Sequence, residues 1–544
     1  MVGKIVFIGL LFCIIAISLY LSKNMKSKKL KQLREDWGKI PEDGPDFEAA
    51  LYHRFSNTLI GNSYGIDNDT WQDLDLDKIY TLINRALTPI GAQYLYKLLR
   101  HPLMGSELLN KREILFSHFA KNEKLRESVQ LAIYPLKDEN SKYLPYFLWK
   151  PLPDKPPYAF IFRVLGFIAI IVLILVLLGY LNFIAMIAVF IINLAVRLYI
   201  KRKIDIYIHS FQYLGVLIRA ADKISTLEFD ELGDIQTELK KSLRSTKNIA
   251  KDIFALQVKD EFGFFEYLNI YFLWDITGFY AAIDKISKNI NSLITLYESV
   301  GILDSHISIA SFRTQYHDFC RPQFVADYGK YVVKEIHNPL LEKPIANSFE
   351  FNLKNIMITG SNMAGKTTFV KTMGVNVVLA QTINTCFASH YQAPFIKVIS
   401  SIGRTDDLVS GKSYYLAEVE SVLRLVNAST DKTVHLFILD EIFRGTNSVE
   451  RLAASIEVLK YLANGKDYVL VATHDLQLTK ILDQEYENYH FRDQVCAEGL
   501  DFDYKLHPGP STTKNAIALL DFVGYPKSIV NRAANRVQTH VVES

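Results

Sequence analysis

The stretch Gly360-Ser-Asn-Met-Ala-Gly-Lys-Thr367 decides the fold of the carboxy-terminal part of the chain. Residues 354–359 before it have the composition of a short buried strand, and residues 369–380 after it have the apolar periodicity of a helix. Strand, glycine loop and helix in this order predict a phosphate-binding loop, whose backbone N–H groups cradle a nucleotide's phosphates. Lys366 is expected to reach the β- and γ-phosphates of ATP, and Thr367 to offer its hydroxyl to Mg²⁺. The predicted phosphate-binding residues are Gly360, Ser361, Asn362, Met363, Ala364, Gly365, Lys366, Thr367 and Thr368.

A second apolar run, residues 433–439, ends in the acidic pair Asp440-Glu441. A buried parallel strand that delivers two carboxylates at its carboxyl end is the Walker B arrangement. Asp440 is then predicted to hold Mg²⁺, and Glu441 to orient or deprotonate the attacking water. The alternative is a pair of solvated acids at the end of a strand, and the phosphate loop upstream favours the catalytic interpretation.

A third run, residues 467–473, ends in His474. A lone histidine is usually structural, but this one closes a strand of the same predicted sheet. It is therefore predicted to be a catalytic residue, a sensor that hydrogen-bonds the γ-phosphate or the lytic water. Together the three runs predict a doubly wound α/β ATPase domain over residues 330–540.

Length and composition leave the partner open. A chain of 544 residues is too long for one core, so at least two domains are expected. The net charge of +3 neither demands nor excludes a nucleic-acid partner. The four cysteines have no C-x-x-C spacing, which argues against a zinc site or a disulfide framework and favours a reducing compartment.

Three uncharged apolar stretches predict membrane segments: residues 5–21, 164–178 and 183–196. The first is read as an uncleaved anchor, with a cleaved signal peptide as the alternative. The other two, joined by a short turn, are read as a hairpin, with a buried helix pair as the alternative. Basic residues on both sides of the hairpin place its ends, and the ATPase domain, in the cytoplasm of a multi-pass cell-membrane protein.

The expected organisation is an amino-terminal anchor, a basic linker, two mainly helical regions on either side of the hairpin, and the ATPase domain. The predicted boundaries are 1–22, 23–69, 70–155, 160–200, 201–329 and 330–540.

The motifs resemble those of one family, the MutS proteins of DNA mismatch repair. Residues 360–368 are similar to its loop G-P-N-M-G-G-K-S-T, residues 440–447 resemble D-E-I-G-R-G-T-S, and residues 472–474 match A-T-H. Residues 404–416 look like the segment with the S-G-x-S-T-F signature, and residues 488–490 and 504–509 like the family's late strand pair. Upstream, Leu87-Thr-Pro-Ile-Gly91 through Leu103 is similar to the start of the MutS core domain, and Leu303-Asp304 through Pro322 to the segment before the ATPase domain.

The resemblance implies a P-loop NTPase of the MutS type after a mainly α-helical core or lever region, with ATP and Mg²⁺ as ligands. It also implies a homodimer in which Ser413 of the signature segment completes the partner's site, and in which Asn362 touches the γ-phosphate. Hydrolysis would then open and close the dimer. Nothing before residue 70 resembles the family's mismatch-reading domain, so the resemblance does not extend to the reading of mismatches.

Two functions follow from this. The first is a membrane-anchored ATPase that binds mismatched or branched duplex DNA, for which a basic helix face is available; the alternative for that face is a solvated surface balanced by acids. Its residues are Lys240, Lys241, Arg244, Lys247 and Lys251. The second is a membrane ATPase that acts on a protein or lipid partner without nucleic acid. A nucleotide-regulated scaffold is disfavoured because every catalytic position is filled.

Overall fold

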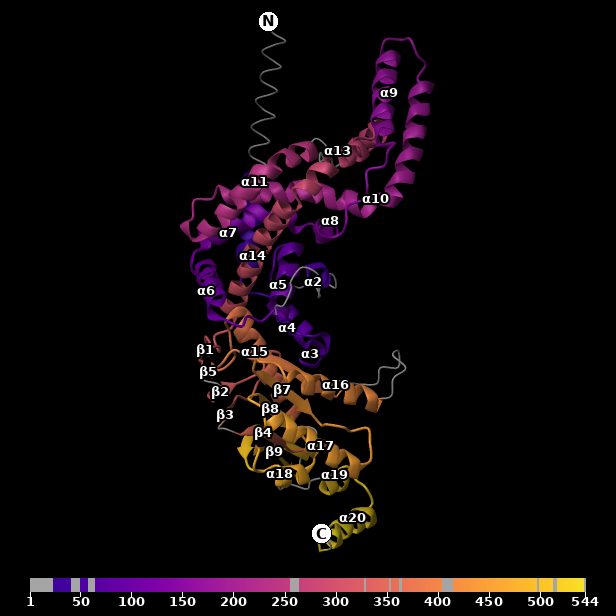
Figure 1. The fold of residues 1–544 in the computed structure, drawn as a ribbon. Coiled ribbons are helices and arrows are strands. Elements are labelled where there is room, and N and C mark those ends of the chain that lie inside the picture. Colours follow the sequence, from indigo (N-terminus) through magenta and orange to yellow (C-terminus); the bar gives the residue numbers. More distant parts are fainter. Residues whose placement is uncertain are drawn as a thin grey trace. The chain divides into compact units, whose positions relative to one another are not determined.

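The computed structural model describes residues 23–40, 49–56, 64–254, 264–326, 329–351, 354–361, 364–403, 414–496, 499–511 and 516–542. The chain forms two compact units that are interleaved in sequence. The first comprises residues 1–62, 83–97 and 114–315, and the second residues 63–82, 98–113 and 316–544. Figure 1 labels most of the elements of both units. The second unit thus includes two short amino-terminal stretches that the sequence analysis assigned to the linker and to the helical region.

The first unit is helical throughout the part that the structure describes. Its helices are α2 (Ala50–Ser56), most of α5 (Pro89–Arg100), the second half of α6 (Ser106–Lys121), α7 (Glu123–Ile133), α8 (Leu144–Trp149), α9 (Ala159–Leu177), α10 (Ile184–Ser225), α11 (Gly233–Phe254), α12 (Phe264–Phe272), α13 (Trp274–Lys288) and α14 (Ile290–Gln315). Its core forms where α10, α11 and α14 pack together, for example through Leu217, Leu239 and Val300. The 42-residue α10 therefore joins the apolar stretch at its start to this core, with no break near residue 201.

Two segments flagged by the sequence, Leu87–Gly91 and Leu303-Asp304, meet inside the first unit. The Asp304 carboxylate accepts hydrogen bonds from the backbone N–H of Leu87 at 3.0 Å and of Thr88 at 2.8 Å, and from the Thr88 hydroxyl at 2.6 Å. Burial raises the pKa of Asp304 to about 6, although these hydrogen bonds act in the opposite direction. A Cβ at Gly91 would lie 2.3 Å from Asp304 Oδ2, which explains why this helix start needs glycine.

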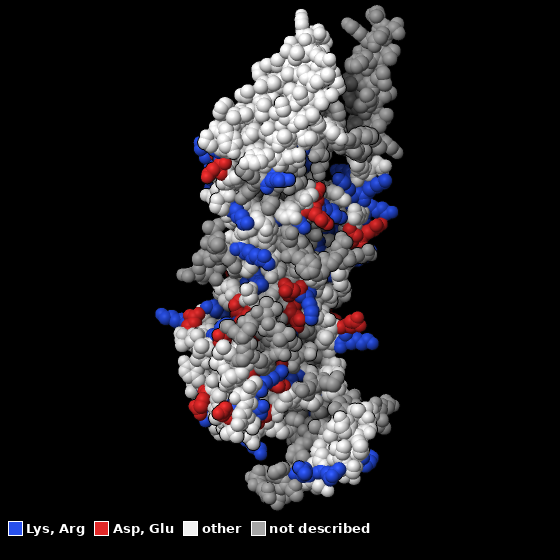
Figure 2. Space-filling model, turned by 90° about the vertical axis from the view of Figure 1, so that its right-hand side faces the viewer, with Lys and Arg blue, Asp and Glu red and all other residues white. Residues whose placement is uncertain are grey.

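Helix α9 and the first part of α10 form an antiparallel pair whose apolar side chains are largely exposed. Figure 2 shows this pair as a surface without Lys, Arg, Asp or Glu on the face in view. Among the described residues, α9 alone is long and apolar enough to cross a membrane, by length and composition, and Ile184–Ile200 is a shorter apolar helix. Three membrane-spanning helices were predicted from the sequence, and among the described residues only α9 remains a candidate. The predicted anchor over residues 5–21 lies outside the described residues.

The second unit is built on two sheets. The smaller one has the strand order β1-β5-β2-β3, with β1 (Gln323–Phe324), β2 (Tyr331–Ile336), β3 (Asn347–Phe351) and β5 (His390–Ala393). The larger one has the order β10-β9-β4-β8-β7-β6, with β4 (Asn355–Thr359), β6 (Lys397–Ile402), β7 (His435–Asp440), β8 (Tyr468–Ala472), β9 (Tyr486–Cys496) and β10 (Gly499–Pro508). All neighbours in the larger sheet are parallel except β9 and β10, which pair antiparallel.

Helices cover both faces of the larger sheet. They are α15 (Lys366–Ile383), α16 (Tyr414–Ala428), α17 (Ser448–Ala463) and α18 (Leu476–Ile481), and the unit also holds α3 (Asn68–Asp73), α4 (Leu76–Ile83), α19 (Ala516–Phe522) and α20 (Lys527–Val542). Phe437 of β7 packs with α16 and α17, whereas Ile438, its neighbour on the opposite face, lies against Gly374 of α15. The predicted order, a mainly helical part followed by a mixed α/β part, is confirmed.

Candidate active site

Three neighbouring parallel strands deliver the predicted site residues at their carboxyl ends. In the sheet order β4-β8-β7, the phosphate loop follows β4, His474 follows β8, and Asp440 closes β7 with Glu441 directly after it. All residues of these strands are buried, as expected for a sheet covered on both faces. The carboxyl edge of such a sheet is where α/β folds bind ligands.

Two glycines shape the phosphate loop. Gly360 has φ +140°, and a Cβ there would lie 2.9 Å from the carbonyl oxygen of Phe491. Gly365 has φ +104° and stands directly before the first residue of α15. A side chain at either position would be strained, so the glycine spacing of the motif follows from the turn that brings the backbone to the helix amino terminus.

Lys366 lies inside this turn. Its Nζ donates to the carbonyl oxygens of Gly360 at 2.7 Å and Ser361 at 2.8 Å, and it lies 3.3 Å from Nε2 of His474. The residue is 3% exposed. The ammonium group is therefore held where the loop, the helix terminus and β8 converge.

Thr367 and Asp440 are joined by a hydrogen bond of 2.6 Å from the threonine hydroxyl to Asp440 Oδ2. Burial raises the pKa of Asp440, and the Thr367 hydrogen bond only partly offsets this. Its Oδ1 is buried without a hydrogen-bond partner in the described part of the chain, and the Arg444 guanidinium lies 4.0 Å away. A hydroxyl beside a carboxylate with a spare oxygen fits Mg²⁺, which takes few protein ligands and completes its shell with phosphates and water.

Glu441 is held between two basic side chains in a left-handed backbone conformation with φ +54°. One carboxylate oxygen lies 2.6 Å from Nε2 of His474, and the other 2.7 Å from Nε of Arg444. Burial acts to raise the pKa of Glu441, but the His474 hydrogen bond and the nearby charges outweigh it, so the pKa lies below its ordinary value. The carboxylate is ionised at neutral pH and aimed by both partners.

A pocket of about 540 Å³ opens beside the phosphate loop. Its lining combines Lys366 and Thr367 with apolar and aromatic side chains from β2, β9 and β10, among them Ile336, Phe491 and Tyr504. A pocket that combines a cation and hydroxyl groups with apolar and aromatic side chains suits a nucleotide's phosphates and base. These walls could not be predicted from the motif, because β2, β9 and β10 lie outside it in the sequence.

The structure thus brings together Lys366, Thr367, Asp440, Glu441 and His474. Asn362, Met363 and Ser413, to which the sequence analysis gave phosphate-contacting roles, lie outside the described residues. Arg444 was quoted within the Asp-Glu motif but received no role. Its position three residues after Glu441 was the available signal.

Comparison with known proteins agrees with this geometry. The family model for MutS domain V matches residues 356–540. Residues 356–540 are a MutS domain V. It is 29% identical over 260 residues to the DNA mismatch repair protein MutS of Thermus thermophilus, a match that covers 47% of this chain and 31% of the relative.

Two further MutS proteins give similar figures. The protein of Thermus aquaticus is 30% identical over 240 residues, covering 43% of this chain and 29% of the relative. The protein of Methanococcoides burtonii is 30% identical over 268 residues, covering 47% of this chain and 30% of the relative. The chain therefore matches less than a third of the length of these curated MutS proteins, and the resemblance to MutS applies to domain V.

Proposed function

We propose that the chain is an ATPase whose nucleotide site is completed by a second copy, so that ATP binding and hydrolysis change the geometry of a homodimer. The observation that carries the ATPase activity is the cluster at the ends of β4, β8 and β7. It combines a cation in a phosphate loop, a hydroxyl–carboxylate pair suited to Mg²⁺, and an ionised glutamate aimed by His474 and Arg444. The second copy is proposed from the similarity of the domain to MutS domain V.

Each residue has a distinct role in this mechanism. Lys366 and the loop backbone bind the phosphates. Thr367 and Asp440 would hold Mg²⁺, which would neutralise charge on the phosphate oxygens. Glu441 orients the attacking water or takes its proton, and His474 fixes the Glu441 carboxylate. Mg²⁺-dependent release of phosphate from ATP by the purified full chain is the test, and a chain that binds ATP without releasing phosphate would contradict the proposal.

We further propose that the α9–α10 pair anchors the protein in a membrane. Only 11% of the most apolar 18-residue window of α9 is buried within the structure, whereas the core helix of a soluble protein buries most of its apolar side chains. Trp274 and Tyr267, aromatic residues of the kind enriched at membrane–water interfaces, are exposed on α13 and α12, and both helices pack against α9.

The proposed second span of this hairpin is the shorter apolar helix Ile184–Ile200 at the start of α10. A hairpin with both ends in the cytoplasm places the α9–α10 turn on the outer side. We therefore expect Tyr180→Cys, in the turn, to react with a membrane-impermeant maleimide in intact cells, and Val449→Cys, exposed on α17, to react only after lysis. The unsubstituted chain with its native cysteines gives the background. Equal labelling of both variants before lysis would contradict the proposed topology.

DNA is the proposed partner of the dimer, because the matched relatives are named DNA mismatch repair proteins and α11 exposes four basic side chains. These are Lys240, Lys241, Arg244 and Lys247; of them, Lys247 pairs with Asp222 at 2.9 Å. The alternative partner is a protein or a lipid, for which ATP turnover would be independent of nucleic acid.

Replacing these four residues by glutamine is expected to weaken binding of the full chain to a branched or mismatched duplex and to reduce its salt dependence. Each lost phosphate contact lowers the slope of log K against log salt by about 0.9. Fluorescence anisotropy at several salt concentrations measures both effects. If neither duplex binds at low salt, the DNA proposal fails and the alternative partner is favoured.

A further inference from the structure

Two cysteines that are far apart in the sequence face each other in the second unit. Cys320 and Cys386 form an antiparallel bridge outside the named strands. The N–H of Cys320 donates to the carbonyl oxygen of Cys386 at 2.8 Å, and the N–H of Cys386 donates to that of Cys320 at 3.0 Å. Residues that exchange both backbone hydrogen bonds have Cα atoms about 5.5 Å apart, and disulfides span Cα distances of about 4.4–6.8 Å. The backbone therefore already holds the two residues at a distance that a disulfide can bridge.

Both cysteines are free thiols, and their surroundings differ. Cys386 is fully buried, whereas Cys320 is partly exposed. The hydrogen bond between the two thiols lowers the pKa of Cys320, while burial raises the pKa of Cys386 well above its ordinary value. The thiolate is the form that reacts with oxidants. Cys320 is therefore the thiol that an oxidant reaches first, and Cys386 is its resolving partner.

Cys386 is fixed in place by contacts with α15, the helix that follows the phosphate loop. Its Sγ lies 3.5 Å from Oδ1 of Asn376 in this helix, and the same oxygen accepts from the N–H of Phe387 at 2.7 Å. The carbonyl oxygen of Phe387 accepts from the N–H of His337 at 2.9 Å. When the Cys386 thiol loses its proton to form a disulfide, Asn376 keeps the stronger of its two donors. The bond therefore leaves no buried acceptor unpaired at this place.

The cysteine pair joins two segments with different positions in the fold. Cys320 lies shortly after Tyr316, where the chain enters the second unit. Cys386 lies shortly after the end of α15, whose first residue is Lys366. The Tyr316 and Phe387 rings also meet edge to face, with centroids 5.5 Å apart. A disulfide here would tie the entry segment, residues 316–320, to the end of the phosphate-loop helix.

We propose that Cys320 and Cys386 are a modification site: a hydroperoxide oxidises them to a reversible disulfide, which restrains the entry segment against the end of α15. The proposal depends neither on the ATPase activity nor on a second copy. The cysteine spacing favours a reducing compartment, where disulfides are usually transient and redox-sensing. The bond is therefore a reversible modification and not a permanent cross-link.

The reaction balances with hydrogen peroxide as the oxidant. The Cys320 thiolate attacks a peroxide oxygen, so that an S–O bond forms, the O–O bond breaks and hydroxide leaves with the electron pair, which gives a sulfenic acid. The Cys386 sulfur then attacks the Cys320 sulfur: the S–S bond forms, the S–O bond breaks, and the departing hydroxyl takes the Cys386 thiol proton and leaves as water. Two thiols are oxidised and the peroxide is reduced to water, and a dithiol reductant reverses the reaction.

The first test oxidises the purified full chain with hydrogen peroxide in a Cys13→Ser, Cys496→Ser background, which leaves only the two facing cysteines. We expect mass spectrometry of a digest made without reductant to find the peptides of Cys320 and Cys386 linked, and dithiothreitol to separate them. A non-reducing gel should show a single chain. If peroxide leaves both thiols free, or links two chains through these residues, the proposal is wrong.

The second test asks which cysteine reacts first. In Cys386→Ser, whose hydroxyl can still donate to Asn376, peroxide should leave a sulfenic acid on Cys320 that dimedone traps. In the matched control Cys320→Ser, Cys386 should give at least about tenfold less adduct, the change in thiolate fraction that one pKa unit brings. Cys386→Ala replaces the serine variant if that chain does not fold. Equal adduct on both cysteines, or more on Cys386, contradicts the assigned order.

Hydrogen–deuterium exchange tests the proposed restraint. Oxidation is expected to slow exchange at the amide groups of Cys320 and Cys386 at least about tenfold, because a cross-link opposes the local openings that break the bridge. Exchange in α7 of the first unit is the control and should not change. Equal exchange at the bridge in the oxidised and reduced chain would refute the restraint.

Discussion

Replacing Lys366 by alanine is expected to lower ATP turnover by about 10²–10³-fold, the usual cost of losing one preorganised electrostatic contact to the transition state. The Kd for ATP should rise about tenfold to a hundredfold, because a hydrogen bond to a charged group contributes about 1.5–3 kcal/mol. The reason lies in the geometry: the Lys366 ammonium is the buried cation within the glycine turn, between the carbonyl groups of Gly360 and Ser361. Phosphate release and equilibrium binding of a fluorescent ATP analogue measure the two effects.

Lys354→Ala is the matched control for this experiment. Lys354 precedes β4, at the strand end opposite the phosphate loop, and its Nζ donates to the carbonyl oxygen of Asp483 at 2.7 Å. Its loss removes a lysine from the same unit without touching the loop, so turnover should stay at the wild-type level. Unchanged turnover in Lys366→Ala would mean that this loop is not the hydrolytic site.

The sequence predicted the parts of the site that depend on local order. A buried strand followed by Gly360 and Gly365 restricts the backbone to few conformations, because both positions have a positive φ that favours glycine. Asp440 and Glu441 end a strand that is apolar throughout, so their place at the sheet edge followed from the pattern. The apolar helix pair was visible as two uncharged stretches, but the continuation of its second helix into the core as α10 was hidden because apolar and amphipathic residues join without a break signal.

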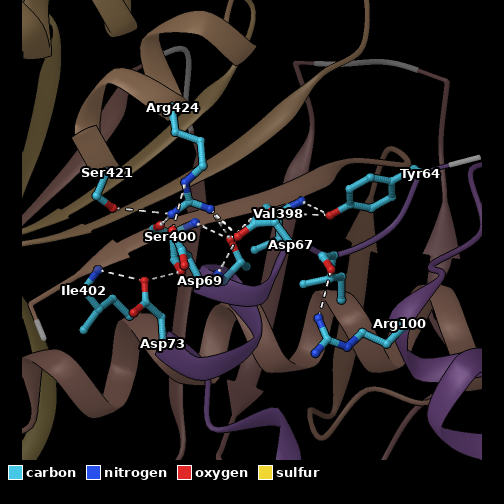
Figure 3. A network of polar contacts seen from close by, with 12 residues as sticks. Tyr64, Asp67, Asp69, Asp73, Arg100, Val398, Ser400, Ile402, Ser421 and Arg424 are labelled. Atoms are coloured by element: carbon cyan, nitrogen blue, oxygen red, sulfur yellow. Dashed lines mark hydrogen bonds and ion pairs between the residues drawn. The ribbon is translucent and has the colours of Figure 1, made fainter. Parts of the chain in front are cut away.

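The side chains that cover the outer edge of β6 (Figure 3) and those that line the pocket beside the phosphate loop could not be predicted in this way. Asp73 looks like any acid on a short helix, and only the fold reveals that it accepts the N–H of Ile402. Arg424 likewise reads as an ordinary helix residue until Asp67 and Ser400 are placed beside it. Such contacts join residues more than 300 positions apart, and hydrophobic periodicity carries no information about side-chain hydrogen bonds over that distance.

Glu441→Gln is the second large effect that we expect: turnover falls by about 10²–10⁴-fold, the usual contribution of a positioned acid or base, while ATP binding is retained. Lys366, Thr367 and Asp440 form the binding side of the site, and the substitution changes none of them. Glutamine keeps the size of the side chain but removes the negative charge that pairs with His474 at 2.6 Å and Arg444 at 2.7 Å. Trapped nucleotide, measured after rapid gel filtration with radiolabelled ATP, separates binding from turnover.

The lowered pKa of Glu441 indicates whether this residue mainly orients the attacking water or takes its proton. A carboxylate held ionised by His474 and Arg444 is a weak base at neutral pH, so its main contribution is to orient water through its negative oxygens. Wild-type turnover should therefore not titrate through this group between pH 8 and about pH 5, since the ordinary glutamate pKa is about 4.3. Glu450→Gln, which neutralises an acid on α17 that accepts from Thr446 at 3.3 Å, serves as the control. If Glu441→Gln hydrolyses ATP at the wild-type rate, water is activated elsewhere, and the ion pairs of Glu441 serve only to stabilise the left-handed turn after β7.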